Sequence, residues 1–243
     1  MKISDKSLKR LKYVLFSFLA LFLAACVFLV LMYFKIIKLN HPNGIKGADV
    51  SAYQGVIDWN VLSKNLDFVF VKATEGSSYT DDCFTANFSG AMSAGLFTGA
   101  YHFFSYDSSG KSQAEHFIST VGFHNGMLPA VIDVEFYGGY YKNPKSAEDV
   151  KTDLTDMIAA LEEYYGVKPI IYCTAKAYRL YGGIFDGCPL WVRNVYFKPF
   201  DDEWLFWQYT DTEELDGYSG DEKYIDMNVF NGGYEDLKDI TVK

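Results

Sequence analysis

The sequence predicts an α/β fold in which one transmembrane helix precedes an irregular barrel of eight strands, the last third of which lacks helices. Three observations predict this fold. Residues 13–34 form a long uncharged apolar run, short apolar runs alternate with helical patterns from residue 47 onward, and polar side chains recur at the ends of the short runs. An open sheet built from similar units is the alternative that these patterns leave open.

The N-terminal run is the first element. It contains 22 residues, Tyr13 to Phe34, without a charge, and as a helix it would cross about 30 Å of hydrocarbon. Five basic residues precede it and only Lys35 and Lys38 follow nearby, so the positive-inside rule puts the N-terminus in the cytoplasm. We therefore predict a single-pass cell-membrane protein with a cytoplasmic basic segment (1–12), a transmembrane helix (13–34), a linker (35–46) and an extracellular catalytic domain (47–243).

Processing of this N-terminus is the competing interpretation, because Leu23-Ala24-Ala25-Cys26 resembles a lipoprotein cleavage site. Cleavage would leave a lipoprotein with a lipidated Cys26, or a secreted protein. The apolar run continues to Phe34, where such proteins usually turn polar, and the sequence therefore favours an uncleaved anchor.

The remainder of the chain is predicted to alternate strands and helices in the rhythm of β/α units. The predicted strands are 47–53, 68–73, 97–104, 130–136, 169–174, 190–195, 205–209 and 224–229. The predicted helices are 83–94, 112–121, 147–165 and 175–181. The third helix has the clearest signals, with Ser146 as its N-cap, an apolar stripe from Val150 to Tyr165, and Gly166 as its stop.

Composition narrows the classes of function. The net charge is −9, but residues 41–243 alone contain 15 Lys and Arg against 30 Asp and Glu, which disfavours nucleic acid as a partner. Twenty Phe, 19 Tyr and four Trp suit a groove that stacks on sugar rings, and they suit an ordinary core equally well. Cys173 and Cys188 could pair outside the cell, although buried thiols explain the cysteine count as well.

The segment from Val131 to Phe136 places two carboxylates inside an apolar, β-branched run. Asp133 and Glu135 are two residues apart and therefore share one face of a strand. At roughly 5 to 6 Å their repulsion of about 3 kcal/mol would keep one of them protonated near neutral pH. A solvated or salt-bridged pair at a strand end is the simpler explanation of an isolated Asp-x-Glu.

Further polar residues gather near the ends of the predicted strands, where the active sites of barrel enzymes form. They are Asp49, Ser51, Lys72, Glu75, Tyr101, His102, Tyr172, Arg193, Gln208 and Asp226. Buried acidic groups are costly without a partner or a purpose, which favours a site. His102 alone fits a hydrogen-bonded wall residue better than a base, and at most one of Trp204 and Trp207 should face a groove. The segment from Tyr137 to Tyr141 suits either a sugar clamp or a surface turn.

Motifs of other enzyme classes are missing from the folded part of the sequence. It contains no G-x-S-x-G, no nucleotide-binding glycine motif and no histidine spacing typical of a metal site, so we predict neither a metal nor a cofactor. Paired carboxylates among aromatic residues fit hydrolysis of a glycosidic bond. One carboxyl group would protonate the leaving oxygen and another would stabilise the oxocarbenium-like centre.

The order of the motifs resembles glycoside hydrolase family 25, the muramidase lysozymes. The matching segments are Gly47-Ala48-Asp49-Val50-Ser51, Gln54-Gly55, Ile57-Asp58-Trp59, Lys72-Ala73-Thr74-Glu75-Gly76, Tyr101-His102-Phe103, Asp133-Val134-Glu135, Trp207-Gln208-Tyr209 and Ile225-Asp226-Met227-Asn228. The resemblance implies a (β/α) barrel of the TIM type with five β/α units plus three further strands. It also implies action on the β-1,4 bond between N-acetylmuramic acid and N-acetylglucosamine in peptidoglycan.

Carried over residue by residue, the resemblance implies four catalytic carboxylates. Glu135 would be the general acid, Asp133 would stabilise the reacting centre or orient the N-acetyl group of the substrate, and Asp49 and Asp226 would complete the site. The residues predicted to bind substrate are Tyr172, Lys72, Glu75, Tyr101, His102, Gln208 and Trp207. Participation of the N-acetyl group would remove the need for a protein nucleophile.

Two other functions stay open at this point. A family 18 chitinase would use D-x-D-x-E, but Val131 stands at the first acidic position. A wall-binding module without catalysis is the other alternative, and the retained carboxylates argue against it. Arg193-Asn194 departs from the family pattern. This departure concerns the details of the sugar-binding subsites and not the chemistry of the reaction. We expect a monomer that binds peptidoglycan and acts in cell-wall remodelling or lysis.

Overall fold

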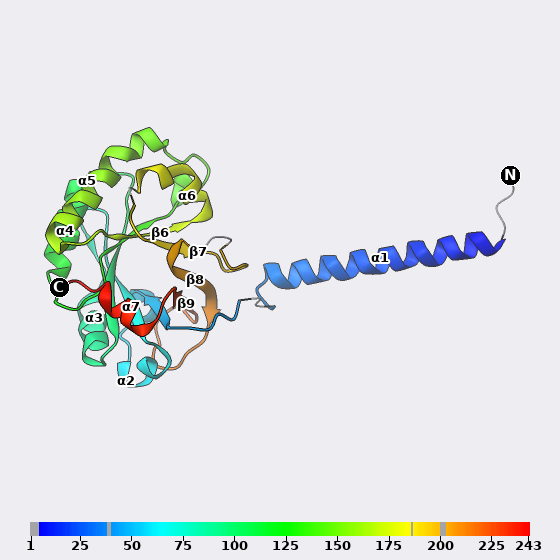
Figure 1. Cartoon of the computed structure of the whole chain (residues 1–243), viewed down its shortest axis with the longest axis horizontal. Coiled ribbons are helices and arrows are strands. Elements are labelled where there is room, and N and C mark those ends of the chain that lie inside the picture. Colours follow the sequence, from blue (N-terminus) through cyan, green and yellow to red (C-terminus); the bar gives the residue numbers. More distant parts are fainter. Residues whose placement is uncertain (1–4, 38–39, 186, 200–202) are drawn as a thin grey trace. The chain divides into compact units, whose positions relative to one another are not determined.

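The computed structural model describes residues 5–37, 40–185, 187–199 and 203–243. The chain forms two compact units, Met1–Leu39 and Asn40–Lys243, and each is described by itself (Figure 1). Residues 1–4 of the predicted cytoplasmic segment and residues 38–39 of the predicted linker lie outside the described residues.

The first unit is dominated by one helix, α1 (Asp5–Tyr33). Its 29 residues rise about 44 Å, which exceeds the hydrocarbon thickness of about 30 Å. Its most apolar 18-residue window has a mean hydropathy of 3.0, and none of that window is buried. The predicted apolar helix is therefore present, and by length and composition it suits a membrane span or a signal sequence. It begins eight residues earlier than the apolar run, because the preceding Lys, Arg and Leu residues are good helix formers.

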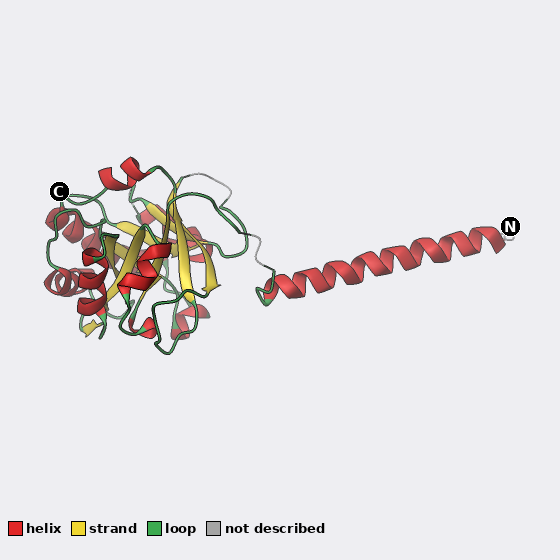
Figure 2. Cartoon of the chain, turned by 90° about the horizontal axis from the view of Figure 1, so that it is seen from below, coloured by secondary structure: helices red, strands yellow, loops and turns green. Residues whose placement is uncertain are grey.

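The second unit contains a closed barrel of eight strands (Figure 2). The strands are β1 (Lys46–Val50), β2 (Phe68–Glu75), β4 (Phe97–Phe103), β5 (Val131–Val134), β6 (Ile170–Thr174), β7 (Leu190–Arg193), β8 (Trp204–Glu213) and β9 (Ile225–Phe230). β1 pairs with both β2 and β9, which closes the ring and excludes the open sheet. Neighbouring strands are parallel except around β9, which is antiparallel to β1 and β8. A short β3 (Tyr79–Thr80) extends the end of β2 as a hairpin.

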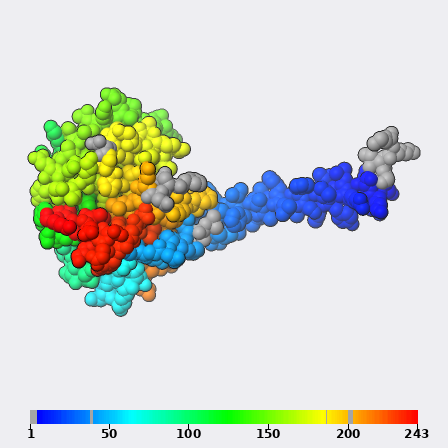
Figure 3. All heavy atoms as spheres, viewed as in Figure 1, coloured from blue at the N-terminus to red at the C-terminus, as the bar shows by residue number. Residues whose placement is uncertain are grey.

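Helices fill the connections from β1 to β7 and are absent from the described parts of the last two connections. The α-helices are α2 (Trp59–Leu62), α3 (Phe84–Ser93), α4 (Gly110–Val121), α5 (Ala147–Tyr165), α6 (Ala175–Tyr181) and α7 (Tyr234–Asp239). Four 3-10 turns supplement them: η1 (Ala52–Gln54), η2 (Ser63–Asn65), η3 (Gly138–Tyr141) and η4 (Gly182–Ile184). The C-terminal α7 lies on the surface of the barrel unit (Figure 3, red).

Local signals explain where the prediction was accurate. α5 and α6 have the predicted bounds. Ser146 caps α5 by accepting a hydrogen bond from the Asp149 N–H, and Gly166 ends it in the left-handed conformation at φ 75°.

Two predicted strands need correction, and two short helices were not predicted. The first strand was expected to reach Tyr53, but it ends at Val50 because Ser51 caps η1 and its own N–H donates to the Gln54 side chain. β5 ends at Val134, so Glu135 lies just beyond the strand. The helices α2 and α7 were not predicted, since each is at most six residues long and carries too few residues for a helical period.

The barrel interior is apolar at one end and polar at the other. Along β2, Phe68 and Phe70 point inward and are followed on the same face by Lys72, while Val69 and Val71 pack outward in the layer beneath the helices. The inner apolar cluster consists of Phe68, Phe70, Leu128, Val131, Ile170, Tyr172, Trp191, Phe206, Phe230 and Leu237. The same alternation continues around the ring, so the polar residues that follow these positions meet above an aromatic floor.

A glycine lets this floor form. Gly47 of β1 faces the Phe68 ring, and a Cβ atom at residue 47 would lie 2.3 Å from it. Phe68 therefore occupies the space that a side chain on β1 would need, and the next inward position on β1, Asp49, stands above the ring.

Candidate active site

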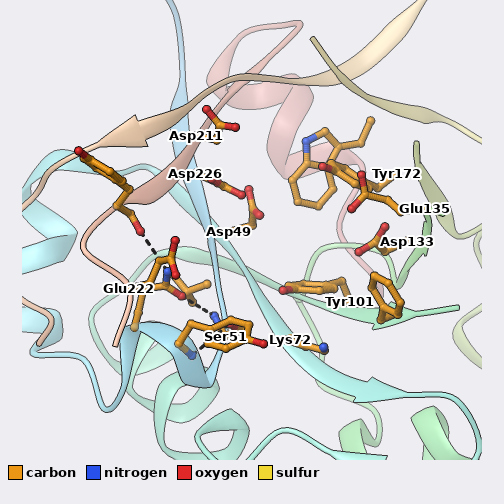
Figure 4. Close-up of a pocket in the computed structure, with 16 residues that line it drawn as sticks. Asp49, Ser51, Lys72, Tyr101, Asp133, Glu135, Tyr172, Asp211, Glu222 and Asp226 are labelled. Atoms are coloured by element: carbon orange, nitrogen blue, oxygen red, sulfur yellow. Dashed lines mark hydrogen bonds between the residues drawn. The ribbon is translucent and has the colours of Figure 1, made fainter. Parts of the chain in front are cut away.

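The polar end of the barrel surrounds a cavity of about 320 Å³ at the C-terminal ends of the parallel strands (Figure 4). It is lined by Asp49, Val50, Ser51, Tyr53, Gln54, Lys72, Tyr101, Phe103, Asp133, Glu135, Tyr172, Trp191, Asp211, Glu222, Tyr224 and Asp226. The four carboxylates predicted to be catalytic are all among them. All eight barrel strands contribute to this lining, which is the arrangement expected of a barrel active site.

Asp133 and Glu135 form the first pair of carboxyl groups, at the end of β5 and beside Tyr172 (Figure 4). Asp133 is 8% exposed, and its Oδ1 atom has no hydrogen-bond partner in the described part of the chain. Burial raises the pKa of Asp133 well above its ordinary value, and the charge of Glu135 adds to the effect. Burial also raises the pKa of Glu135, against the opposing charge of Arg193. Such carboxyl groups retain protons that they can transfer to a substrate.

Asp49 and Asp226 form the second pair, directly opposite each other on the antiparallel strands β1 and β9. Burial raises the pKa of Asp49 to about 6, although hydrogen bonds from Asn228 and Gln208 favour its ionised form. Burial, and then the charge of Asp49, raise the pKa of Asp226 to about 9. Two adjacent carboxyl groups repel when both are ionised, so the pair holds one proton near neutral pH, on Asp226.

Two buried amides support this second pair. The Gln208 Nε2 atom donates to Asp49 Oδ1 at 3.1 Å and to Asp226 Oδ2 at 3.1 Å. The Asn228 Nδ2 atom donates to Asp49 Oδ1 at 2.7 Å. Asn228 Oδ1 in turn accepts a hydrogen bond from Trp191 Nε1 at 2.8 Å. Gln208 therefore contacts the acids from behind the cavity and is not part of its lining.

Tyr172 and Tyr101 contribute hydroxyl groups to the cavity wall. The Tyr172 hydroxyl donates to Gln208 Oε1 at 2.9 Å, and its ring meets Trp191 edge to face with centroids 4.7 Å apart. Burial and the neighbouring carboxylates raise the pKa of both tyrosines well above the ordinary value. Both hydroxyl groups therefore stay protonated.

Lys72 brings a positive charge to the cavity wall. Its Nζ atom lies 2.8 Å from Glu75 Oε2 and 5.1 Å from the centre of the Phe103 ring. The Lys72 side chain is 14% exposed and that of Glu75 is 43% exposed. Glu75 does not line the cavity and reaches it only through Lys72.

His102 lies in the barrel wall rather than in the cavity. It is fully buried, with its ring nitrogens 2.7 Å from Thr74 Oγ1 and 3.0 Å from Gln113 Oε1. Burial lowers the pKa of His102 to about 4, so the ring is neutral at physiological pH. The structure thus places His102 as the hydrogen-bonded wall residue considered from sequence, away from the predicted substrate contacts.

Trp207 also lies outside the cavity. Its indole N–H donates to the Asn194 carbonyl at 2.9 Å, and its ring packs against Trp204 with centroids 5.9 Å apart. Strict alternation would put residues three apart on opposite faces, but Trp204 and Trp207 share one face because the register of β8 shifts between the partners of Leu190 and Trp191. Both rings therefore join the outer apolar layer.

Several lining residues were not among the predicted site residues: Tyr53, Asp211, Glu222 and Tyr224. Asp211 accepts a hydrogen bond from Arg193 Nη2 at 2.7 Å. Strand alternation could not have found it, because β8 is irregular beyond Gln208 and the inward face changes there. Tyr53 is 65% exposed and Tyr224 37% exposed, and the signal available in the sequence was an aromatic residue at the end of a predicted strand.

The cysteines do not form the bridge that was considered. Cys173 is a free thiol in the barrel wall, so it does not pair with Cys188. Burial raises the pKa of the Cys173 thiol to about 12, which keeps it protonated and unreactive.

Comparison with known proteins gives a consistent result. Residues 48–218 match the family model described as glycosyl hydrolases family 25. Lysozyme M1 of Streptomyces globisporus is 36% identical over 206 residues, which cover 78% of this chain and 69% of that protein. A protein of Escherichia coli K12 without an assigned function, YegX, is 38% identical over 204 residues, or 80% of this chain and 72% of its own length.

Solved structures agree with the sequence relatives. A family 25 glycosyl hydrolase from Bacillus anthracis is 48% identical and superposes with a TM-score of 0.78, covering 84% of this chain and 97% of that one. The bacterial lysozyme from Streptomyces coelicolor is 34% identical with a TM-score of 0.72, covering 82% and 98%. Both alignments cover nearly all of the solved chain and leave out about a sixth of this one.

Proposed function

This chain belongs to glycosyl hydrolases family 25, and from that premise we propose how it acts as a muramidase on peptidoglycan. It hydrolyses the β-1,4 bond between N-acetylmuramic acid and N-acetylglucosamine. The observation that carries the mechanism is the pair of the buried Asp133 and the half-buried Glu135, both of which have raised pKa values at the wall of the cavity. A chitinase of family 18 is not favoured, since the relatives are lysozymes and muramidases.

Glu135 is the general acid in this proposal. Its proton passes to the glycosidic oxygen as the bond to the anomeric carbon breaks, and the carbonyl oxygen of the neighbouring N-acetyl group bonds to that carbon. A water molecule then attacks the anomeric carbon, the Glu135 carboxylate accepts the water's proton, and the N-acetyl group is released. Asp133 lies beside Glu135 with an unpartnered carboxyl oxygen, which suits it to orient the N-acetyl N–H.

Asp49 and Asp226 contribute charge rather than the transferred proton. The single negative charge of the pair, on Asp49, stabilises the positive charge that develops at the anomeric carbon. Tyr172, Tyr101 and Lys72 line the same cavity and are proposed to bind the sugar. Gln208 supports the acids and Glu75 supports Lys72, so both act on the substrate only through their neighbours.

The reaction is tested with the full-length chain in detergent micelles and purified peptidoglycan. We expect new reducing ends on N-acetylmuramic acid. Reducing ends on N-acetylglucosamine, or an absence of fragments between pH 4 and 8 while peptidoglycan binding persists, would overturn the proposal. The second outcome would identify the chain as a wall-binding module.

We also propose the finer description of the barrel, as five β/α units of the TIM type followed by three further strands. The helices that precede β2, β4, β5, β6 and β7, and the loops around β8, support this description. The catalytic domain would then span residues 47–243 and act as a monomer.

The proposed location is the outer face of the cell membrane, with residues 1–12 in the cytoplasm, residues 13–34 spanning the bilayer and residues 35–46 as a linker. The length and composition of α1 and the cell-wall substrate support it. Mass determination of the chain extracted from membranes tests it, because cleavage before Cys26 would remove the first 25 residues. Protease added to intact protoplasts should digest the catalytic domain, and its protection there would reverse the proposed orientation.

A further inference from the structure

The hydrogen bonds behind the cavity form a continuous chain through Trp191, Asn228, Asp49, Gln208 and Tyr172. The donor and acceptor atoms of successive members are 2.8, 2.7, 3.1 and 2.9 Å apart. All members except Asp49 are at most 6% exposed, so solvent does not compete for these bonds. The direction of each bond follows from which atoms are able to donate.

Trp191 fixes the direction at one end, because an indole N–H can only donate. The Asn228 Oδ1 atom must accept that bond, which turns the Asn228 amide nitrogen toward Asp49. The reversed amide would place a donor against a donor at Trp191 and an oxygen against the carboxylate of Asp49. Asp49 is therefore held as an acceptor.

Gln208 fixes the direction at the other end. Its amide nitrogen faces Asp49 and Asp226, so its oxygen faces Tyr172. An amide oxygen only accepts, and the Tyr172 hydroxyl must therefore donate its one proton to Gln208. Toward the cavity this hydroxyl has only lone pairs left.

We infer that Trp191, Asn228 and Gln208 form a polarity frame. The frame keeps Asp49 as the acceptor of the Asp49–Asp226 pair, with the shared proton on Asp226, and it makes Tyr172 a hydrogen-bond acceptor toward the cavity. The inference rests on the proposed function for its ligand. The sugar group that meets Tyr172 must be a donor, as an acetamido N–H or a hydroxyl is. Asn228 and Gln208 are positioning residues, since they act through Asp49, Asp226 and Tyr172.

Other charged and titratable groups also face the Asp49–Asp226 pair. They are Lys72 on β2, Tyr101 on β4, Asp133 and Glu135 at the end of β5, Tyr172 on β6, Arg193 on β7 and Asp211 on β8. The amide variants proposed below leave all of these groups in place. A difference in the titration of Asp49 between wild type and such a variant therefore arises from the loss of a hydrogen bond of the frame.

The wild-type chain gives the first test, by NMR titration of its 13C-labelled aspartate carboxyl groups in detergent micelles. At pH 7 we expect Asp49 to be ionised and Asp226 to be protonated. The reverse assignment, or two ionised groups, would overturn the inference whether or not the chain is active.

Two variants give the second test. Asn228→Leu removes one donor to Asp49, together with the acceptor for Trp191, and Gln208→Met removes the other donor; neither variant adds a charged group. In each we expect the Asp49 titration, and the acid limb of the kcat/KM profile, to move up by about one pH unit. An unchanged Asp49 titration in whichever variant folds would contradict the frame.

A double-mutant cycle tests the direction of the Tyr172 hydroxyl. We expect Tyr172→Phe to lower kcat/KM about tenfold in the wild-type background and less than about threefold in Gln208→Met, where the hydroxyl is no longer oriented. In Gln208→Glu an oxygen acceptor is retained, and the wild-type effect of Tyr172→Phe should return. Equal losses in all three backgrounds would show that Gln208 does not orient Tyr172.

Gln113→Met is the matched control. Gln113 is as buried as Gln208, but its partners are His102 in the barrel wall and the backbone of Ser105 and Ser108, none of which belongs to the frame. We expect it to lower the melting temperature without moving the Asp49 titration. If the titrations follow the frame while wild type releases no reducing N-acetylmuramic acid, the proposed function fails and the frame stands. If wild type is active and the titrations do not follow the frame, the frame alone fails.

Discussion

The two carboxyl pairs of the cavity consist of similar groups but are held in opposite ways. Asp49 receives hydrogen bonds from two buried amides, and Asp226 shares one of them. Asp133 keeps a buried oxygen without a partner in the described structure, and burial is the main reason that it resists ionisation. A carboxyl group surrounded by donors holds a charge in place, whereas a buried group with few donors is suited to keep and transfer a proton.

The largest expected effect is a loss of catalytic rate on substitution in the Asp133–Glu135 pair. Glu135→Gln should lower kcat by about 10² to 10⁴, because the amide cannot protonate the leaving oxygen. The measurement is the rate of release of reducing ends from peptidoglycan. Glu163→Gln, an equivalent change at an exposed position on α5, is the control and should retain activity. Turnover of Glu135→Gln within tenfold of wild type would remove Glu135 as the acid.

Substitution in the Asp49–Asp226 pair should cost more free energy of unfolding than substitution in the Asp133–Glu135 pair. Asp49→Ala leaves the amide donor of Asn228 without its acceptor and takes one of two acceptors from Gln208, and we expect it to lower the free energy of unfolding by about 1 to 3 kcal/mol. Asp133→Ala removes a carboxyl whose Oδ1 has no partner, and it should cost less than about 1 kcal/mol. Urea unfolding of both variants tests the comparison. Equal losses would mean that the amides do not distinguish the pairs.

The pH dependence of stability should reveal the proton on Asp226. Its pKa is raised from 3.8 to about 9 in the folded chain, so between these values the folded state binds more protons than the unfolded state. Stability must then fall as pH rises through this window, by up to about 1.4 kcal/mol per pH unit. Asp226→Asn should flatten the curve of unfolding free energy against pH. Parallel curves for variant and wild type would contradict the assignment.

The smallest expected effect concerns Lys72. Its charge opposes the rise in the pKa of Asp133, so Lys72→Met should raise that pKa further. We expect kcat/KM to fall less than about tenfold, because the charge acts through a partly screened medium. Activity measured from pH 4 to 8 tests this. A loss as large as that of Glu135→Gln would place Lys72 among the groups that take part in the chemistry.

Much of the site was predictable because its signals are local. Asp133 and Glu135 follow an apolar run, and Asp49 and Asp226 lie at predictable inward positions of β1 and β9. The role of Gln208 was not predictable, since a glutamine beside a strand end is compatible with either contacting the sugar or supporting the acids. Asp211 and the face of Trp207 were missed because β8 is irregular at two places, and one irregularity reverses the alternation.

The aromatic segment after Glu135 shows the same limit. It was considered as a sugar clamp or a surface turn, but in the structure it forms η3 and is tied to the preceding loop. The Tyr106 N–H donates to the Tyr137 hydroxyl at 3.0 Å, and the Tyr140 hydroxyl donates to Asp107. These contacts join residues about 30 positions apart, which no local pattern reveals.

The sequence by itself determined the apolar N-terminal helix, the β/α rhythm and the identity of the acids, because hydrophobic period, capping residues and motif order are local properties. Only the tertiary structure decided how the acids differ. Closure of the barrel brings β1 beside β9, so Asp49 meets Asp226, Gln208 and Asn228 across more than 150 residues of chain. The proton on each acid depends on burial and on those distant donors, and both exist only after the ring has closed.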